Sequence, residues 1–452
     1  MREKTLSMEE LVSLAKRRGF IFQASEIYGG ISGFWDLGPY GVELANNIKQ
    51  SWWKYFVYSN FNVVGLDTTI IQHSKLWKAS GHVDTFVDPM VDCKSCKHRF
   101  RADHVAGINS ANLAKLDKAL KNKSCPNCGK VGTFTSPHHF NMMFKTYVGP
   151  IEDGANQTYL RPETAGGIFA QYELVRETTR KKLPFGIAQI GKAFRNEITP
   201  GDFIFRLREF IQMELEAFVH PKEADKWYKF WKEYCMNWLL DIGLKKEHLR
   251  LHDHRPEERA HYAAASTDIQ YRYPFGFKEL YGIANRTDYD LSVHQKESGK
   301  DLSYFDEETK EQFIPYIIEP SVGVERLLMA LLLDGYDEEE VKGEKRIVMR
   351  FTKQLAPVKV AVLPLSKKPE LSTLARNVFK KISGEYNVEY DETQSIGRRY
   401  RRQDEIGTPY CVTIDFESLE DKAVTVRERD SMKQERIKIE ELKQHLLKEL
   451  NH

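Results

Sequence analysis

Residues Gly191–Phe218, with the sequence GKAFRNEITPGDFIFRLREFIQMELEAF, decide the fold that we expect for this chain. Thr199–Asp202 is a cluster of turn-forming residues. After this turn, the side chains alternate with the period of two that is typical of a strand. One set is Phe210, Gln212, Glu214 and Glu216, and the other is Ile211, Met213 and Leu215. The stretch therefore predicts a hairpin made of a strand, a loop and a second strand.

Charged residues gather on this expected hairpin: Arg195, Glu197, Arg206, Arg208 and Glu209. An arginine presents a fixed fork of donors that suits phosphate, and the nearby Phe210 ring can stack on a base. One hypothesis is therefore a nucleoside triphosphate bound on the hairpin. The alternative is a hairpin with ordinary ion pairs across its strands. The stretch alone leaves both open.

The bulk composition indicates a globular protein. The chain has 452 residues, which favours two or three domains, with 41% hydrophobic and 29% charged residues. The net charge of +2 means that any nucleic-acid surface must be a local patch. No apolar run reaches the length of a membrane span, and the charged N-terminus lacks the apolar core of a secretory signal. We therefore expect no membrane association and a cytoplasmic location. A P-loop is excluded because GxxxxGK[ST] is absent.

Residues 83–137 are expected to form an insertion that holds a metal. Cys93 and Cys96 form one CxxC pair, and Cys125 and Cys128 form another. Two such pairs supply the four thiolates of a tetrahedral zinc site, which would be structural because no coordination position stays open. The alternatives are two reduced pairs without metal, or a redox pair.

The pattern changes after an acidic segment, 337–344, which we expect to be a linker. From about residue 355, helices alternate with strands of the parallel-sheet type, which indicates a separate α/β domain over 355–452. One expected helix in this domain carries a basic and aromatic cluster: Arg398, Arg399, Tyr400, Arg401 and Arg402. The cluster is a candidate for contact with a tRNA phosphate backbone, and the alternative is a solvated helix face.

Several separated segments together resemble one family. FRNE at 194–197 with REF at 208–210 resembles motif 2 of the class II aminoacyl-tRNA synthetases, and GVER at 323–326 resembles motif 3. The sequences RPETAGG, GIANRTDYDL, IEPSVG and YRRQDEIGTPYCVTIDF add a resemblance to glycyl-tRNA synthetases of the homodimeric type. The resemblance covers nearly the whole chain.

The resemblance implies an α+β catalytic domain at 1–345, built on an antiparallel sheet of the class II type. The zinc-type insertion would lie within it, and an anticodon-binding α/β domain would follow at 355–452. It also implies a homodimer formed partly by motif 1, which would be a helix and strand over 39–72. The activity would be the ATP-dependent attachment of glycine to tRNA(Gly) through glycyl-adenylate, with Mg²⁺ bound to ATP.

The resemblance also implies roles in ATP binding. Arg195 would hold the α-phosphate, and Glu197 would orient the nucleotide. Phe210 and Arg326 would cover the two faces of adenine, and Arg195, Glu197 and Arg326 would be the catalytic set. Glu279 would bind Mg²⁺. The further ATP contacts would be Asn196, Phe205, Arg206, Leu207, Arg208, Glu209, Leu280, Gly323, Val324 and Glu325.

Glycine offers no side chain, so its recognition must depend on the ammonium group and on the exclusion of bulk. The resemblance assigns Glu163, Glu319 and Ser321 to the ammonium, whose three donors they would satisfy. The other residues expected around glycine are Arg101, Phe210, Ile211, Gln212, Met213, Glu214, Pro320, Val322 and Gly323.

Two other functions stay open at this point. One is a synthetase-like protein that binds nucleic acid or assists a polymerase without catalysis, which would be expected to have lost the catalytic arginines and carboxylates. The other is a class II synthetase for a different amino acid, such as proline, threonine or serine, which would need a larger pocket.

Overall fold

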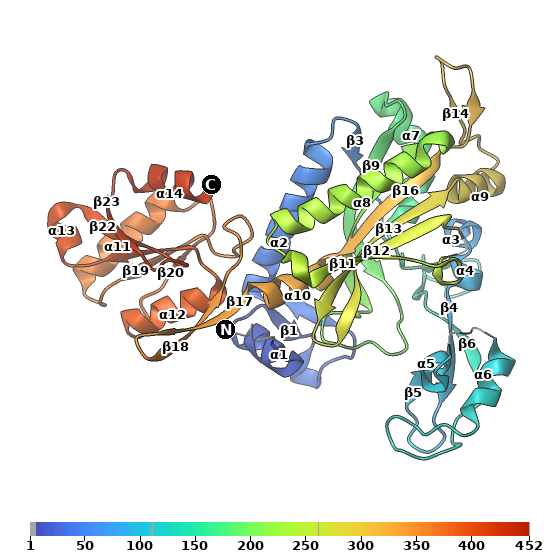
Figure 1. Cartoon of the computed structure of the whole chain (residues 1–452), viewed down its shortest axis with the longest axis horizontal. Coiled ribbons are helices and arrows are strands. Elements are labelled where there is room, and N and C mark those ends of the chain that lie inside the picture. Colours follow the sequence, from blue (N-terminus) through green and yellow to red (C-terminus); the bar gives the residue numbers. More distant parts are fainter. Residues whose placement is uncertain (1–5, 109, 111, 261, 452) are drawn as a thin grey trace.

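The computed structural model describes residues 6–451, except 109, 111 and 261. Figure 1 shows three bodies: a large sheet with its helices, a small insertion at its lower right, and a C-terminal domain at the left. In the part of the chain that the structure describes, no helix combines the length and apolar character needed to cross a membrane.

The large body is built on a seven-stranded sheet with the order β11-β12-β13-β16-β10-β9-β3. All neighbouring strands are antiparallel except β3 and β9, which are parallel. The expected antiparallel sheet is therefore confirmed. The strands are β3 (Val63–Gly65), β9 (Phe185–Phe194), β10 (Glu209–Val219), β11 (Leu249–Asp253), β12 (Ala265–Tyr273), β13 (Gly276–Thr287) and β16 (Tyr316–Gly323).

The hairpin predicted at 191–218 forms strands β9 and β10 of this sheet, between β16 and the edge strand β3. Its register runs from Glu209 opposite Phe194 to Phe218 opposite Phe185. The loop between the strands turns at Asp202 and Phe203, which both have a positive φ. Buried apolar side chains anchor the loop on the core: Phe203, Ile204, Phe205 and Leu207. The loop is therefore held in place, and its arginines are fixed relative to the sheet.

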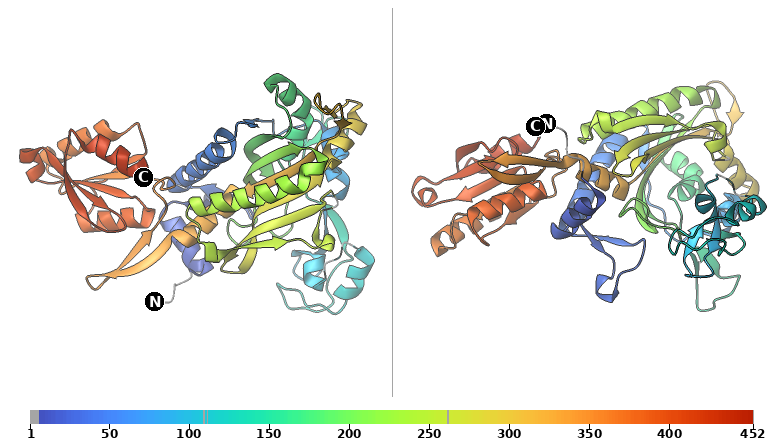
Figure 2. Two further views of the ribbon diagram at one scale, coloured as in Figure 1. Left: turned by 45° about the horizontal axis from the view of Figure 1, so that its top comes forward. Right: turned by 60° about the horizontal axis from the view of Figure 1, so that its bottom comes forward.

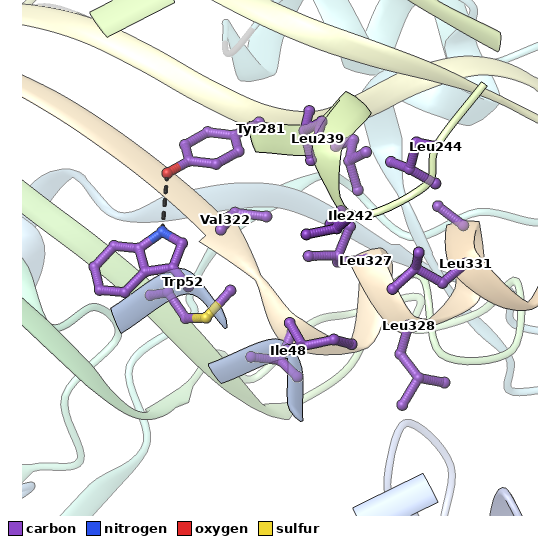
Figure 3. Close-up of a cluster of buried hydrophobic side chains, with 14 of the residues drawn as sticks. Ile48, Trp52, Leu239, Ile242, Leu244, Tyr281, Val322, Leu327, Leu328 and Leu331 are labelled. Carbon is purple, nitrogen blue, oxygen red and sulfur yellow. Dashed lines mark hydrogen bonds between the residues drawn. The ribbon is translucent and has the colours of Figure 1, made fainter. Parts of the chain in front are cut away.

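Three helices pack against one face of the sheet: α2 (Pro39–Trp53), α8 (Ala224–Asp241) and α10 (Val324–Gly335). Figure 3 shows this core, in which the Trp52 indole N–H donates to the Tyr281 hydroxyl over 3.2 Å. The apolar set of β10, including Met213 and Leu215, belongs to this core. The helical part of the segment 39–72 is confirmed by α2 and the short π-helix Lys54–Tyr58 that continues it.

The opposite face is covered at one end by α7 (Ala165–Thr179) and α9 (Tyr289–Ser298), over a smaller apolar cluster that includes Phe218. The rest of this face is polar and remains open. The strand expected in the segment 39–72 is short, because regular pairing ends at Gly65 and only isolated backbone contacts follow among the described residues, such as the bridge between Ile71 and Leu160. The Arg161 guanidinium donates to the carbonyl oxygens of Thr68 and Lys192.

The insertion carries its own small core around Val91, Leu116 and Phe134. Its elements are β4 (Val87–Asp92), β5 (Arg99–Arg101), α5 (Ala102–Ala106), α6 (Leu113–Leu120) and β6 (His138–Asn141). The short helices α3 (Ser74–Ala79) and α4 (His82–Thr85) lead into it. Figure 1 shows α3 and α4 beside the large body, and α4 leads directly into β4, so the base of the insertion lies there.

The C-terminal domain is a five-stranded mixed sheet with the order β20-β19-β21-β22-β23. Strand β19 is parallel to its neighbours β20 and β21, whereas β22 and β23 are antiparallel additions. The last helix, α14, begins after β23, which includes Ile437 and Lys438. The elements are β19 (Val360–Pro364), α11 (Pro369–Ile382), β20 (Val388–Tyr390), α12 (Ile396–Ile406), β21 (Tyr410–Ile414), α13 (Glu417–Asp421), β22 (Ala423–Glu428), β23 (Gln434–Lys438) and α14 (Leu442–Asn451).

The expected linker at 337–344 is wrong. The segment forms a hairpin of β17 (Tyr336–Val341) and β18 (Glu344–Met349), which Figure 2 shows projecting between the two large bodies. Its acidic residues are paired with basic ones on β18, and Arg346 reaches Asp404 of α12 over 2.7 Å in a fully buried contact. Ion pairing therefore orders a segment whose composition resembles that of a solvated linker.

The remaining elements are short or peripheral. They are α1 (Met8–Arg17), β1 (Ile21–Gln23), η1 (Glu26–Tyr28), β2 (Trp35–Leu37), β7 (Lys145–Tyr147), β8 (Gln157–Tyr159), η3 (Pro221–Glu223), η4 (Lys246–His248), η5 (Pro256–Glu258), β14 (Tyr304–Phe305) and β15 (Gln312–Phe313).

Candidate active site

The open part of the polar sheet face forms a cavity of about 350 Å³. Strands β10, β13 and β16 form its floor, and the hairpin loop and the start of α10 form one wall. Arginine and aromatic side chains, with Glu197 and Glu279 beside the arginines, line one part of the cavity, and a group of Glu163, Glu214 and Glu319 lines another. This division suits a ligand with a phosphate-bearing part and a cationic part.

Arg326 is positioned by the first turn of α10, directly after β16. Its guanidinium carbon lies 4.4 Å from the centre of the Phe205 ring, and its Nη1 lies 3.0 Å from Glu279 Oε2. Arg326 and burial act in opposite directions on Glu279, and the net effect holds the pKa of this carboxyl below its usual range. The residues expected at adenine and Mg²⁺ are therefore in contact with each other.

Arg195 lies at the end of β9, beside Phe210 at the start of β10. Its guanidinium carbon is 5.3 Å from the centre of the Phe210 ring, and its Nε donates to the Pro162 carbonyl over 3.0 Å. Arg206, from the loop, lies 3.9 Å from Glu197. The structure thus brings the predicted residues Arg195, Glu197, Arg206 and Phe210 to one wall of the cavity.

Four other residues that are expected to contact ATP lie outside the lining of the cavity. The Arg208 guanidinium donates to the carbonyls of Glu197 and Ser32, and Glu209 pairs with Lys192, so both support the loop from outside the cavity lining. Asn196 is also outside the lining, and Val324 is buried in the core. The remaining expected contacts line the cavity: Phe205, Leu207, Leu280, Gly323 and Glu325.

Glu325 has a structural role in addition to lining the cavity. Both of its carboxylate oxygens accept a hydrogen bond from the Ile211 amide, over 3.0 and 3.1 Å. Burial raises the pKa of Glu325 to about 7. This contact fixes α10, and with it Arg326, to the start of β10.

A glutamate network occupies the other part of the cavity. Ser321 donates to Glu214 Oε1 over 2.9 Å, and Gln212 donates to the same oxygen over 2.8 Å. The second oxygen of Glu214 accepts from the Thr164 amide over 2.9 Å and from the Thr164 hydroxyl. Because β10 and β16 place Glu214 directly opposite Ser321, the network follows from the strand register.

Two further carboxylates complete this group. Glu319 accepts a hydrogen bond from Arg286, which also forms a buried ion pair with Asp290 over 2.7 Å. Glu163 lies 3.4 Å from His82 Nε2. The three glutamates of this group, Glu163, Glu214 and Glu319, therefore face a limited number of basic side chains.

The pKa values of these glutamates differ because their surroundings differ. Burial raises the pKa of Glu319 to about 8, since it outweighs the effect of Arg286, and burial together with Glu163 raises the pKa of Glu214. Burial also acts on Glu163, but His82 outweighs it and lowers the pKa to about 2. Raised carboxyl pKa values indicate an excess of negative charge in a poorly solvated site, which an incoming cation would offset.

Five residues expected around glycine do not line the cavity. Ile211 and Met213 on β10, and Pro320 and Val322 on β16, alternate with the cavity-facing residues, so their side chains point to the opposite face of the sheet. Arg101 lies in the insertion and pairs with Asp88 over 2.6 Å and with Asp103. Contact of these five residues with glycine stays a prediction, which the position of their side chains does not support.

Comparisons with known proteins identify the family. The profile for the tRNA synthetase class II core domain (G, H, P, S and T) matches residues 144–335, and that for the anticodon binding domain matches 359–449. The chain is 56% identical to the glycine–tRNA ligase of Clostridium acetobutylicum, over 98% of both chains. It is 54% identical to the ligase of Thermobifida fusca, over 100% of this chain and 99% of the relative.

The chain belongs to the glycine–tRNA ligase family.

Membership of the glycine–tRNA ligase family confirms the class II catalytic core and the C-terminal anticodon-binding domain expected from the sequence. It also confirms the aminoacyl-tRNA synthetase activity that the motifs indicated. The relative from Geobacillus thermodenitrificans is 54% identical over 98% of both chains. This coverage includes both matched domains, so the chain and its relatives share the same two domains.

The insertion of this ligase brings together the four predicted cysteines. Their sulfur atoms all lie within 4.8 Å of one another, with 3.8 Å between Cys93 and Cys128 and 3.7 Å between Cys96 and Cys125. A zinc tetrahedron with Zn–S bonds of about 2.3 Å has sulfur–sulfur edges of about 3.8 Å. The donor set and its spacing therefore fit zinc.

The basic cluster on α12 divides into two groups. Arg399 is buried and donates to the carbonyls of Pro364, Leu365 and Asp391. Tyr400 bonds to Thr413, and Arg402 pairs with Asp391. Arg398 is exposed, and Arg401 lies 3.7 Å from Glu344 at the surface, so the predicted contact with a tRNA backbone would depend mainly on these two arginines.

Sequence reasoning missed several residues of the cavity. Tyr262 lies under Arg286, with 4.0 Å between the guanidinium carbon and the ring centre. His254 pairs with Asp268 over 2.9 Å, and both line the cavity. The alternation of Ser266 and Asp268 with apolar residues on β12 was a signal for Asp268. No local pattern indicated His82 or Thr164.

We predict that Glu319→Gln changes how stability depends on pH. The pKa of Glu319 is raised in the folded state, so between pH 4.5 and 8 the folded state binds a proton that the unfolded state has released. The contribution of Glu319 to the free energy of unfolding therefore falls as pH rises. The variant lacks this titrating group, so its free energy of unfolding should rise by up to about 4 kcal/mol relative to that of the wild type between pH 5 and pH 8.

The measurement is urea unfolding of both proteins at pH 5 and pH 8, at one protein concentration. Glu385→Gln, at an exposed site on the C-terminal domain, is the control. A stability difference that stays constant between the two pH values would contradict the assignment.

Proposed function

We propose that this chain attaches glycine to tRNA(Gly) in two steps, with the cavity as the site of both. The observation that carries the proposal is the division of the cavity: arginine and aromatic residues beside a cluster of three glutamates. The family relationship supports the same activity. In the first step, a glycine carboxylate oxygen attacks the α-phosphorus of ATP and pyrophosphate leaves. In the second, a terminal ribose hydroxyl of the tRNA attacks the glycyl carbonyl and AMP leaves.

Neither step needs a protein nucleophile, so positioning and charge stabilisation supply the catalysis. Arg195 would bind the α-phosphate, where negative charge shifts in the transition state, and Arg206 would reach the outer phosphates or the adenine side. Phe210 and Arg326 would hold adenine between them, which requires Arg326 to leave the Phe205 ring in part. Glu197 would orient the nucleotide.

Glu279 would hold Mg²⁺ when ATP is bound. A carboxylate is a suitable ligand for this hard ion, which would neutralise phosphate charge. In the described structure the Glu279 carboxylate is paired with Arg326. Mg²⁺ would therefore bind to Glu279 and adenine would contact Arg326, so each ligand would use one member of this ion pair.

The glutamate cluster would select glycine. Glu163, Glu319 and Ser321 would surround the ammonium group, and Glu214 would fix Ser321 through its hydrogen bond. The same side chains would occupy the space next to the glycine α-carbon. A methyl group forced into a filled site costs about 1–3 kcal/mol, so alanine would be rejected sterically.

We also propose a homodimer that forms at the end of α2. The exposed Tyr58 and Phe61 adjoin an apolar groove lined by Trp227 and Phe230 of α8. Strand β3 is an edge strand of the seven-stranded sheet, and an open edge invites pairing. A second copy of the chain would cover this surface.

We propose the remaining assignments on the basis of the fold and the family relationship. A catalytic domain would span 1–345 and an anticodon-binding domain 355–452, with the hairpin β17–β18 crossing the boundary at 345. Arg398 and Arg401 would contact the tRNA backbone. Structural Zn²⁺ would bind the four cysteines of the 83–137 insertion. Synthesis of aminoacyl-tRNA would place the enzyme in the cytoplasm.

The test is amino-acid-dependent ATP–pyrophosphate exchange. We expect exchange with glycine and a far lower rate with alanine. Arg195→Ala should reduce exchange about tenfold to several hundredfold, because a charge-assisted bond to phosphate is worth about 1.5–3 kcal/mol. The control is Arg376→Ala, an exposed position on the C-terminal domain. Absence of exchange with glycine would favour the non-catalytic alternative, and equal exchange with alanine would contradict the selection mechanism.

Zinc binding is tested by metal analysis of freshly reduced protein. We expect about one zinc ion per chain, and a large loss in Cys96→Ser because a structural site needs all four ligands. Cys411→Ala, in the core of the C-terminal domain, should retain the metal. A zinc content near zero in the wild type would overturn the assignment.

A further inference from the structure

Glu216 is a buried acid whose role the mechanism above leaves unexplained. It lies on β10 two residues after Glu214, and its side chain is completely buried. Neither of its carboxyl oxygens has a hydrogen-bond partner among the residues that the structure describes. Buried polar side chains in proteins are usually hydrogen-bonded, so an exception of this kind points to a function.

The position of Glu216 is between the cavity and the apolar core. On the same face of β10, Glu214 precedes it in the cavity, and Phe218 follows it in the cluster under α7. The register between β10 and β16 pairs Glu214 with Ser321 and Ala217 with Ile318, which places Glu216 opposite Glu319. Glu216 thus lies on the strand next to that of Glu319, the carboxylate that we assign to the ammonium group.

The surroundings of Glu216 favour its neutral form. Burial, and then the charge of Glu319, raise the pKa of Glu216 well above its ordinary value, and Arg286 does not offset them. Glu214 and Asp290 add further negative charge. Two carboxyl groups opposite each other on neighbouring strands cannot both be ionised without repulsion.

A neutral carboxylic acid has an O–H donor that a carboxylate lacks. Glu319 has an acceptor to offer, because Arg286 is the described residue that donates to it, through one oxygen only. We propose that Glu216 is a positioning residue for glycine: when glycine binds, the protonated carboxyl group of Glu216 donates to Glu319 a hydrogen bond that the structure without substrate lacks, and so directs that carboxylate at the ammonium group. The inference rests on the proposed function of the cavity.

Two substitutions of similar size test the role. Glu216→Gln is neutral and keeps a donor, whereas Glu216→Met removes the donor. In ATP–pyrophosphate exchange with the full-length protein, we expect Glu216→Met to raise the KM for glycine about tenfold or more, since a hydrogen bond to a charged group is lost. The KM for ATP should stay within about twofold, and Glu216→Gln should stay near the wild type for both substrates.

The control is Glu233→Met, at an exposed position on α8, which should leave both KM values unchanged. A wild-type KM for glycine in Glu216→Met would show that Glu216 only fills space. A defect in Glu216→Gln as large as that in Glu216→Met would show that the ionised form is required. Either outcome overturns the proposal but leaves the activity itself intact, whereas absence of wild-type exchange would contradict the proposed function.

Infrared difference spectroscopy gives a second measurement if Glu216→Met fails to fold. Addition of glycine to the wild type should shift a carboxylic-acid carbonyl band, because the acceptor of its hydrogen bond engages the ammonium group. Glu216→Gln should lack this band. Persistence of the band in Glu216→Gln, or no shift in the wild type, would contradict the assignment.

Discussion

The accumulation of buried carboxylates on one face of the central sheet is the constraint on which the site depends. Glu214, Glu216 and Glu319 come from two neighbouring strands, and Arg286 is the basic side chain in contact with Glu319. Burial without sufficient positive charge raises the pKa values of all three. A cavity of this kind favours a small cation as its ligand, and the ammonium group of glycine is such a cation.

The sheet can hold these groups because its two faces have separate tasks. The alternation along β10 directs Met213 and Leu215 into the core under α2, α8 and α10, and directs Gln212 and Glu214 into the cavity. The large apolar core thus compensates for the polar groups buried on the other face. The Glu325 bond to the Ile211 amide then ties the phosphate-binding wall to the same strand.

Much of this organisation was predictable from the sequence because local patterns determine it. The period-two alternation predicted β10 and the faces of its residues, and the two CxxC pairs predicted the sulfur cluster of the insertion. The failures have physical causes. Met213 and Val322 are sequence neighbours of cavity-lining residues, but alternation turns their side chains to the opposite face of the sheet. The linker prediction for 337–344 is wrong because the basic partner Arg346 and the distant Asp404 carry no local signal.

Other parts of the site depend on contacts between segments distant in sequence, which no local pattern reveals. His82 reaches Glu163 from the base of the insertion, and Arg286 lies over Tyr262. The basic cluster on α12 shows the opposite problem. Its composition suits RNA, but Arg399 satisfies carbonyl oxygens inside the domain. Composition indicates a chemistry, whereas burial decides which side chains can perform it.

The central claim is that carboxylates select the substrate through its ammonium group. The most direct measurement compares glycine with glycolate, which has the same carboxylate and nearly the same size but a hydroxyl in place of the ammonium. In ATP–pyrophosphate exchange at pH 7.5, the account predicts exchange with glycine and none above background with glycolate. Exchange with glycolate at a rate comparable to that with glycine would contradict it.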